Sequence, residues 1–166
     1  MEGEKFDIKN NILNNKYAGS PIYINWGAQN YTLDYNDYHN PYGQIGQLGD
    51  DVYFSLSQWA DAVNGDGNSL SENPFYISDT DLSMNQILLN NRALPIAVIE
   101  NDIDGTPRNT SQPDIGAKEY NPCLTDAVIN KLASPGNPIS AGNQEVRDVL
   151  QNQGSATLIS VIINWR

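Results

Sequence analysis

The stretches FDIKNNIL (residues 6–13) and YTLDYNDY (residues 31–38) decide the fold, because the second repeats the pattern of the first. Each stretch alternates apolar and polar residues, which is the pattern of a strand with one buried face. The recurrence of about 25 residues lies in the range that is typical of proteins built from stacked coils. The chain is therefore predicted to stack short strands, and the alignment pairs Phe6 with Tyr31, Ile8 with Leu33, and Asn11 with Asn36.

A third strand is expected between these stretches, in SPIYINWG (residues 20–27), with Ile22 and Ile24 on one face. A coil of about 25 residues with two or three short strands is what a right-handed parallel β-helix requires, because each coil buries its inward side chains only against its neighbours. Asn11 and Asn36 allow two interpretations. Their side-chain amides stack into a ladder along the axis of the coils, or each asparagine only forms a turn.

Composition excludes some partners. The net charge of −11 lies in residues 1–120, which carry 17 acidic and 6 basic residues, whereas residues 121–166 carry 3 of each. Nucleic acids and anionic lipids are not expected as partners, because phosphate binding depends on clustered Lys and Arg. The chain has no apolar segment typical of a signal peptide or a transmembrane helix, so any export signal must lie outside it. The one cysteine leaves the redox compartment open.

The remaining sequence predicts one helix, a cap and a second domain. Residues 55–65 read as a short helix capped by Ser55, with Trp59 as a core residue rather than a ligand platform. An irregular segment up to residue 120 is expected to cover the end of the stack. Residues 121–166 read as three strands with Trp165 in their core. This segment is too short for the roughly 100 residues of an Ig-like sandwich, so it is interpreted as the truncated start of one.

A knot of charged residues in IENDIDGTPRNTSQPDIGAKEY (residues 99–120) suggests two alternatives. Glu100, Asp102 and Asp104 ahead of a glycine resemble the opening of a calcium-binding loop, but a cation and a serine stand where later ligands belong. One alternative is a Ca²⁺ site formed by Asp102, Asp104 and Asp114. The other is a structural cap, in which Arg108 pairs with Asp102 or Asp104 and Asp114 caps a turn. NGDGNS (residues 64–69) is a second calcium candidate, or simply a loop.

Exposed aromatic residues are candidates for a saccharide surface. Tyr35, Tyr38 and Tyr42 lie off the strand alternation or in a turn, and tyrosine faces can stack on sugar rings. Tyrosines also stack in β-sheets without any ligand. His39 could act as a base assisted by Asp37 or Tyr38, but a histidine beside Asn-Pro is more often a loop residue. No residue is assigned a catalytic role.

Five ordered motifs carry a resemblance to a known family: DYNDY (residues 34–38), SL..W (55–59), D.NS...NPF (66–75), DIDG..R (102–108) and DIGA.EY (114–120). Together they resemble the C-terminal end of bacterial right-handed parallel β-helix proteins of the pectate-lyase-like superfamily, in the group with a choice-of-anchor type sorting region. The resemblance covers residues 5–120. The tail is similar to the first strands of an Ig-like module.

The resemblance implies an all-β chain in two parts, with the end coils and cap of a parallel β-helix in residues 1–120 and a partial sandwich in residues 121–166. It also implies extracellular or cell-surface placement in a protein that binds or degrades polysaccharide. Catalytic residues of the superfamily lie in middle coils, so this chain is expected to be a noncatalytic part. Two alternatives remain open: a polysaccharide lyase or hydrolase that uses carboxylates and Ca²⁺, and a surface adhesion module.

Overall fold

The computed structural model describes residues 6–25, 30–122, 127–134, 142–143, 145–152, 154 and 156–163. The chain divides into two compact units, residues 1–121 and residues 122–166, and each is described by itself. The structure is mostly β, as predicted, with one short α-helix. The first unit contains β1 (Phe6–Lys9), β2 (Ile12–Asn14), β3 (Tyr23–Ile24), β4 (Tyr31–Asp34), β5 (Asp37–His39), β6 (Gly46–Leu48), β7 (Asp51–Tyr53), α1 (Leu56–Val63) and the 3₁₀ helix η1 (Ile87–Leu89).

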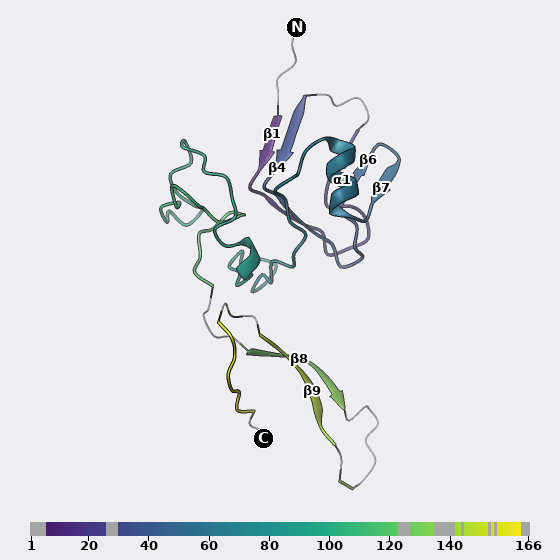
Figure 1. Cartoon of the computed structure of the whole chain (residues 1–166), viewed down its shortest axis with the longest axis vertical. Helices are drawn as coiled ribbons and strands as arrows, with labels where there is room; N and C mark the ends of the chain where they lie inside the picture. Colours follow the sequence, from purple (N-terminus) through teal and green to yellow (C-terminus); the bar gives the residue numbers. More distant parts are fainter. Residues whose placement is uncertain are drawn as a thin grey trace. The chain divides into compact units, whose positions relative to one another are not determined.

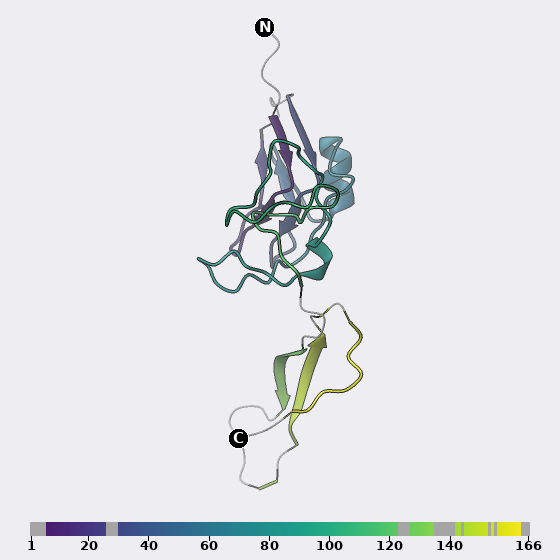
Figure 2. The same cartoon turned by 90° about the vertical axis from the view of Figure 1, so that its left-hand side faces the viewer.

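Three pairs of strands in the first unit are parallel at or near the predicted spacing, and β6 also pairs with β7 in the antiparallel direction. β1 pairs with β4, and this register places Phe6 against Tyr31 and Ile8 against Leu33. β2 pairs with β5 at the same spacing, and β3 pairs with β6 at a spacing that is shorter by a single position. Figures 1 and 2 both show β1 and β4 side by side with α1 next to the strands. The pairings predicted for Phe6 and Ile8 are therefore confirmed.

The repeat continues beyond the second coil at a longer spacing. Asp37 forms a parallel bridge with Leu70, so Leu70 lies next in the row begun by Ile12 and Asp37. The backbone N–H of Asp66 donates to the carbonyl of Leu33 at 2.7 Å. The added residues form α1, which leaves the stack before the chain returns to it. A constant period of 25 residues does not predict this third level, because α1 lengthens the spacing between Asp37 and Leu70.

The asparagine ladder is formed. The side-chain oxygen of Asn36 accepts from the backbone N–H and from the side-chain amide of Asn11, at 3.1 and 3.2 Å. The side-chain amide of Asn36 donates to the carbonyl of Ile8 at 2.8 Å. The backbone N–H of Asn36 donates to the hydroxyl of Ser69 at 2.9 Å, so a serine takes the third place. Asn36 is fully buried, so water cannot form hydrogen bonds with it. These protein groups satisfy its polar atoms instead.

Helix α1 covers the apolar interior of the second coil. Trp59 is fully buried, as predicted, and its ring meets Tyr38 and Tyr53 edge to face. The helix begins after Ser55, but the predicted side-chain cap is not formed, because the Ser55 hydroxyl lies 2.8 Å from that of Ser57 instead. Asn64 ends the helix in the left-handed conformation. One core cluster consists of Ile24, Leu33, Tyr38, Ile45, Leu48, Trp59 and Val63, and a second consists of Met84, Leu89, Ala93 and Ile115.

Burial differs between the two coils. Leu33 of the second coil is buried, whereas Ile8, its partner in the first coil, is only half-buried. Phe6, which the alignment placed on the inward face, is 63% exposed. The reason is its place in the stack, since β1 has β4 on one side and no other described strand on the other. The inward face of the first coil is therefore less well covered.

The second unit contains one antiparallel hairpin, formed by β8 (Ala127–Ser134) and β9 (Arg147–Asn152). Two of the three predicted strands are thus present. The third is wrong for its described residues, 157–163, which form no strand. Trp165 lies outside the described residues. Among the described residues, neither α1 nor η1 has the length and apolar character needed to cross a lipid bilayer.

Candidate functional site

The charged knot is organised around Arg108. Its guanidinium contacts the carboxylate of Glu119 at 2.9 Å and donates to the carbonyls of Asp114 at 3.1 Å and Gly116 at 2.7 Å. The prediction that Arg108 pairs with Asp102 or Asp104 is wrong. The oxygens of Asp102 are taken by backbone N–H groups, and Asp104 contacts a lysine, so Glu119 is left to neutralise the guanidinium.

Asp102 holds two parts of the cap together. One of its oxygens accepts from the N–H groups of Asp104 and Thr106, at 2.9 and 2.8 Å, and the other accepts from the N–H of Glu119 at 2.9 Å. Desolvation opposes ionisation, but these donors prevail and lower the pKa of Asp102. Asp104 forms an ion pair with Lys118 at 3.0 Å. Both aspartates therefore tie the turn at residues 102–106 to the segment that ends the unit.

Asp114 performs a similar role from a buried position. Its two oxygens accept from the backbone N–H groups of Asn91 and Tyr120, at 2.6 and 2.7 Å. Burial nevertheless raises the pKa of Asp114, because desolvation outweighs the two hydrogen bonds. These contacts connect three parts of the cap that are far apart in sequence. The geometry suits a structural cap made of Asp102, Asp104, Arg108 and Asp114.

The predicted calcium site at Asp102, Asp104 and Asp114 is not assembled. In the described part of the chain, no three Asp, Glu, His or Cys side chains come together as they would around a metal ion. The second candidate also has another role, because Asp66 is buried in the core and Asn68 bonds to Asp34 through its side chain at 2.9 Å. Backbone N–H groups and core donors occupy the oxygens that a cation would need.

Asp66 is the centre of a buried polar network that the sequence analysis did not identify. One oxygen accepts from the indole N–H of Trp59 and the hydroxyl of Tyr38, both at 2.8 Å. The other accepts from the hydroxyl of Ser69 and, at 3.4 Å, from the amide of Asn36. Burial and the charge of Asp66 raise the pKa of Tyr38. The network joins α1, the second coil and the third level of the stack.

Asp37 is a second buried carboxylate, and it is only partly satisfied. One oxygen accepts from the N–H of Glu72 at 2.8 Å, and the other is buried without a hydrogen-bond partner. Desolvation raises the pKa of Asp37 from its ordinary 3.8 to about 7. It could not assist His39 as a base, because it lies in the interior between Ile12 and Leu70. Burial also lowers the pKa of His39.

The three predicted saccharide-binding tyrosines differ in exposure. Tyr42 is 64% exposed, and Tyr35 is half-buried at a turn with φ of 56°. Tyr38 is fully buried, so its prediction as a saccharide platform is wrong. Its alignment partner, Leu13, faces the core one coil earlier, and this was a signal that could have identified Tyr38 as a core residue.

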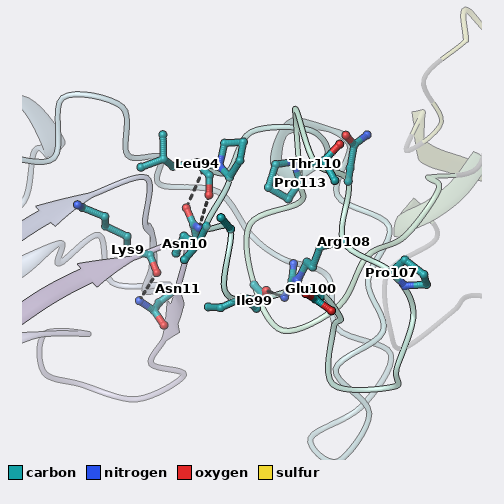
Figure 3. Close-up of a pocket in the computed structure, with 15 residues that line it drawn as sticks. Lys9, Asn10, Asn11, Leu94, Ile99, Glu100, Pro107, Arg108, Thr110 and Pro113 are labelled. Carbon is teal, nitrogen blue, oxygen red and sulfur yellow. Dashed lines mark hydrogen bonds between the residues drawn. The ribbon is translucent and has the colours of Figure 1, made fainter.

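A cleft of about 570 Å³ lies beside the knot. Asn10 stabilises one wall of the cleft, because its side chain forms two hydrogen bonds with the backbone of Leu94, at 2.7 and 2.9 Å. On another wall, Arg108 lies close to Glu100 (Figure 3). Apolar side chains dominate the lining. The guanidinium of Arg108 is engaged by Glu119 and two carbonyls, so the cleft offers shape and apolar contact more than charge. Its further lining residues include Pro95, Ile96, Ala97, Ile99, Pro107 and Pro113.

No protein-family model, curated protein or solved structure matches this chain.

Proposed function

We propose that residues 6–121 are the end coils and the cap of a right-handed parallel β-helix, and that residues 122–166 begin an Ig-like module. The observation that carries the proposal is the set of three parallel pairings at nearly equal spacing along the chain. The asparagine ladder between Asn11 and Asn36 supports it, because side chains that repeat once per coil can bond along the stack. The antiparallel hairpin β8–β9 is compatible with the start of a sandwich.

The proposed role is that of a noncatalytic segment in a secreted or cell-surface protein that binds or degrades polysaccharide. The carboxylates of the knot support a noncatalytic role, because Asp102 and Asp114 are bonded to backbone N–H groups on both oxygens. An acid or base needs an oxygen within reach of a substrate proton. Exposed tyrosines such as Tyr42 are compatible with saccharide contact.

The experiment that tests this role measures turnover and binding on the same chain. Soluble neutral and acidic polysaccharides are incubated with the protein, with Ca²⁺ or with a chelator, and reducing ends and unsaturated products are measured. The expected result is retardation in native gels that contain polysaccharide, without turnover. Turnover that a chelator abolishes would favour a calcium-dependent lyase instead. Binding to a matrix protein that sugars do not inhibit, without any retardation by polysaccharide, would favour an adhesion module.

A further inference from the structure

Two corners of the stack repeat the same local structure in successive coils. The side-chain oxygen of Asn15 accepts from the N–H of Tyr17 at 3.0 Å, and that of Asn40 accepts from the N–H of Tyr42 at 2.7 Å. The side-chain amide of Asn40 donates to the carbonyls of Asn15, Tyr17 and Gly19, at 3.2, 2.9 and 2.8 Å. These bonds hold the corner at residues 15–19 against the corner at residues 40–42. Tyr17 and Tyr42 therefore occupy equivalent places in the two coils.

Both tyrosines point into solvent. Tyr17 is 78% exposed and Tyr42 is 64% exposed, whereas Tyr38, on the preceding strand, is fully buried. Aromatic side chains with this exposure contribute nothing to the core, and burying their apolar area against a ligand would be favourable. A coil repeat that places one such ring in each coil forms a row of aromatic side chains along the surface.

A groove of about 420 Å³ begins at this row. The first coil contributes Tyr17 and its neighbours, and the cap contributes the opposite wall. The groove is lined by Ile12, Asn14, Asn15, Lys16, Tyr17, Tyr76, Ser78, Asp79 and Leu82.

The chemistry of the groove selects a neutral ligand rich in hydroxyl groups. Amide, hydroxyl and phenol groups line it together with two aliphatic side chains, which is the composition of a site for a ring with one apolar face and many polar edges. Its lysine does not offer free positive charge, because Lys16 forms an ion pair with Asp79. The net charge of −11 also repels polyanions. A uronate chain is therefore disfavoured.

We propose that a chain of neutral sugar residues binds along the row of Tyr17 and Tyr42 and enters this groove beside Tyr17, with the two tyrosines as stacking platforms. This inference rests on the proposed function and assigns a place and a ligand class to it. A polymer suits the site better than a monosaccharide, because equivalent tyrosines recur from one coil to the next and a chain can contact both.

The test uses native gel electrophoresis of the full chain in gels that contain barley β-glucan, galactomannan, xyloglucan or polygalacturonate. At least one neutral polymer is expected to retard the chain, and polygalacturonate is not. Tyr17→Ala and Tyr42→Ala should each weaken the apparent Kd by at least about fivefold, whereas Tyr17→Phe should retain binding because the ring is kept. Tyr23→Ala is the matched control, since Tyr23 is 60% exposed but lies on β3, outside both corners.

The outcomes separate this inference from the proposed function. Retardation that Tyr17→Ala and Tyr42→Ala leave unchanged would overturn the groove while the polysaccharide role stands. Stronger retardation by polygalacturonate than by any neutral polymer would overturn the assignment of a neutral ligand. If none of the four polymers retards the chain, both fail. Thermal melts of each variant show that the fold is retained, which is expected because the substituted rings are mostly exposed.

Discussion

Replacement of Asp37 by asparagine should remove most of the pH dependence of folding between about pH 4 and pH 7. Asp37 is fully buried, one of its oxygens has no hydrogen-bond partner, and its pKa is raised from 3.8 to about 7. A folded-state pKa above the unfolded value means that the folded chain binds the proton more tightly. The contribution of Asp37 to stability is therefore fully present below about pH 4 and is lost as the pH rises through about 7.

The size of the effect follows from the shift in pKa. One pKa unit corresponds to about 1.4 kcal/mol, so the ionisation of Asp37 could lower the free energy of unfolding by up to about 4 kcal/mol at pH 8. Asparagine keeps the oxygen that accepts from the N–H of Glu72 and carries no charge. Its NH₂ group has no acceptor, which should lower the free energy of unfolding by about 1–3 kcal/mol. The variant should thus be less stable than the parent at pH 4 and more stable at pH 8.

Urea unfolding monitored by circular dichroism at intervals from pH 4 to pH 8 measures this directly. Asp61→Asn is the matched control, because Asp61 is exposed on α1 and its replacement should leave the pH profile of the parent. Asp114 remains in both variants and supplies a smaller slope of the same sign, since its pKa is also raised. An Asp37→Asn variant with the same slope as the parent would refute the reasoning.

Three further substitutions test the interior and the cap. Gly46→Ala places a methyl group 2.7 Å from the ring of Trp59 and should lower the free energy of unfolding by about 1–3 kcal/mol. Gly67→Ala is the control: no atom beyond its chain neighbours lies within 4 Å of the added methyl group, so the free energy of unfolding should change by less than about 0.5 kcal/mol. Asp66→Ala leaves the indole, phenol and serine donors of the network unpaired and should cost about 3–5 kcal/mol in urea unfolding; a loss below about 1 kcal/mol would contradict the network. Arg108→Gln should speed hydrogen exchange of the amides of Glu119 and Tyr120 at least tenfold by mass spectrometry, while Arg147→Gln, which breaks an exposed pair, should not. Unchanged exchange in Arg108→Gln would show that the pair with Glu119 does not fasten the cap.

The parallel pairing could be predicted from sequence because two physical signals agree. Alternation fixes which side chains face inward, and a shift of one residue would turn every apolar residue outward, so the register follows from the pattern. The pairs Phe6–Tyr31 and Ile8–Leu33 show this. The third level was missed because α1 lengthens the spacing between Asp37 and Leu70 and interrupts the pattern.

The contacts of the cap could not be predicted in the same way. Residues 73–120 contain only one 3₁₀ helix, so no period relates a side chain to its partner. Arg108 pairs with Glu119, although Asp102 is nearer in sequence. The carboxylate oxygens of Asp102 accept hydrogen bonds from backbone N–H groups instead. Such a choice depends on the path of the loop, which local spacing does not determine. Tyr38 was misassigned for a different reason, since its alignment with Leu13 was available and indicated an inward position.

The unusual composition has a physical explanation in this irregular structure. Backbone N–H groups outside helices and sheets need other acceptors, and a buried donor without one costs about 1–3 kcal/mol. Among the described residues, side-chain oxygens of asparagine and aspartate supply such acceptors. Asn40 and Asn109 each accept from the backbone of following residues, and Asp102 and Asp114 together accept five backbone N–H bonds. The charges of Asp102 and Asp114 are therefore explained by the closing of the stack, without any need for a cationic ligand.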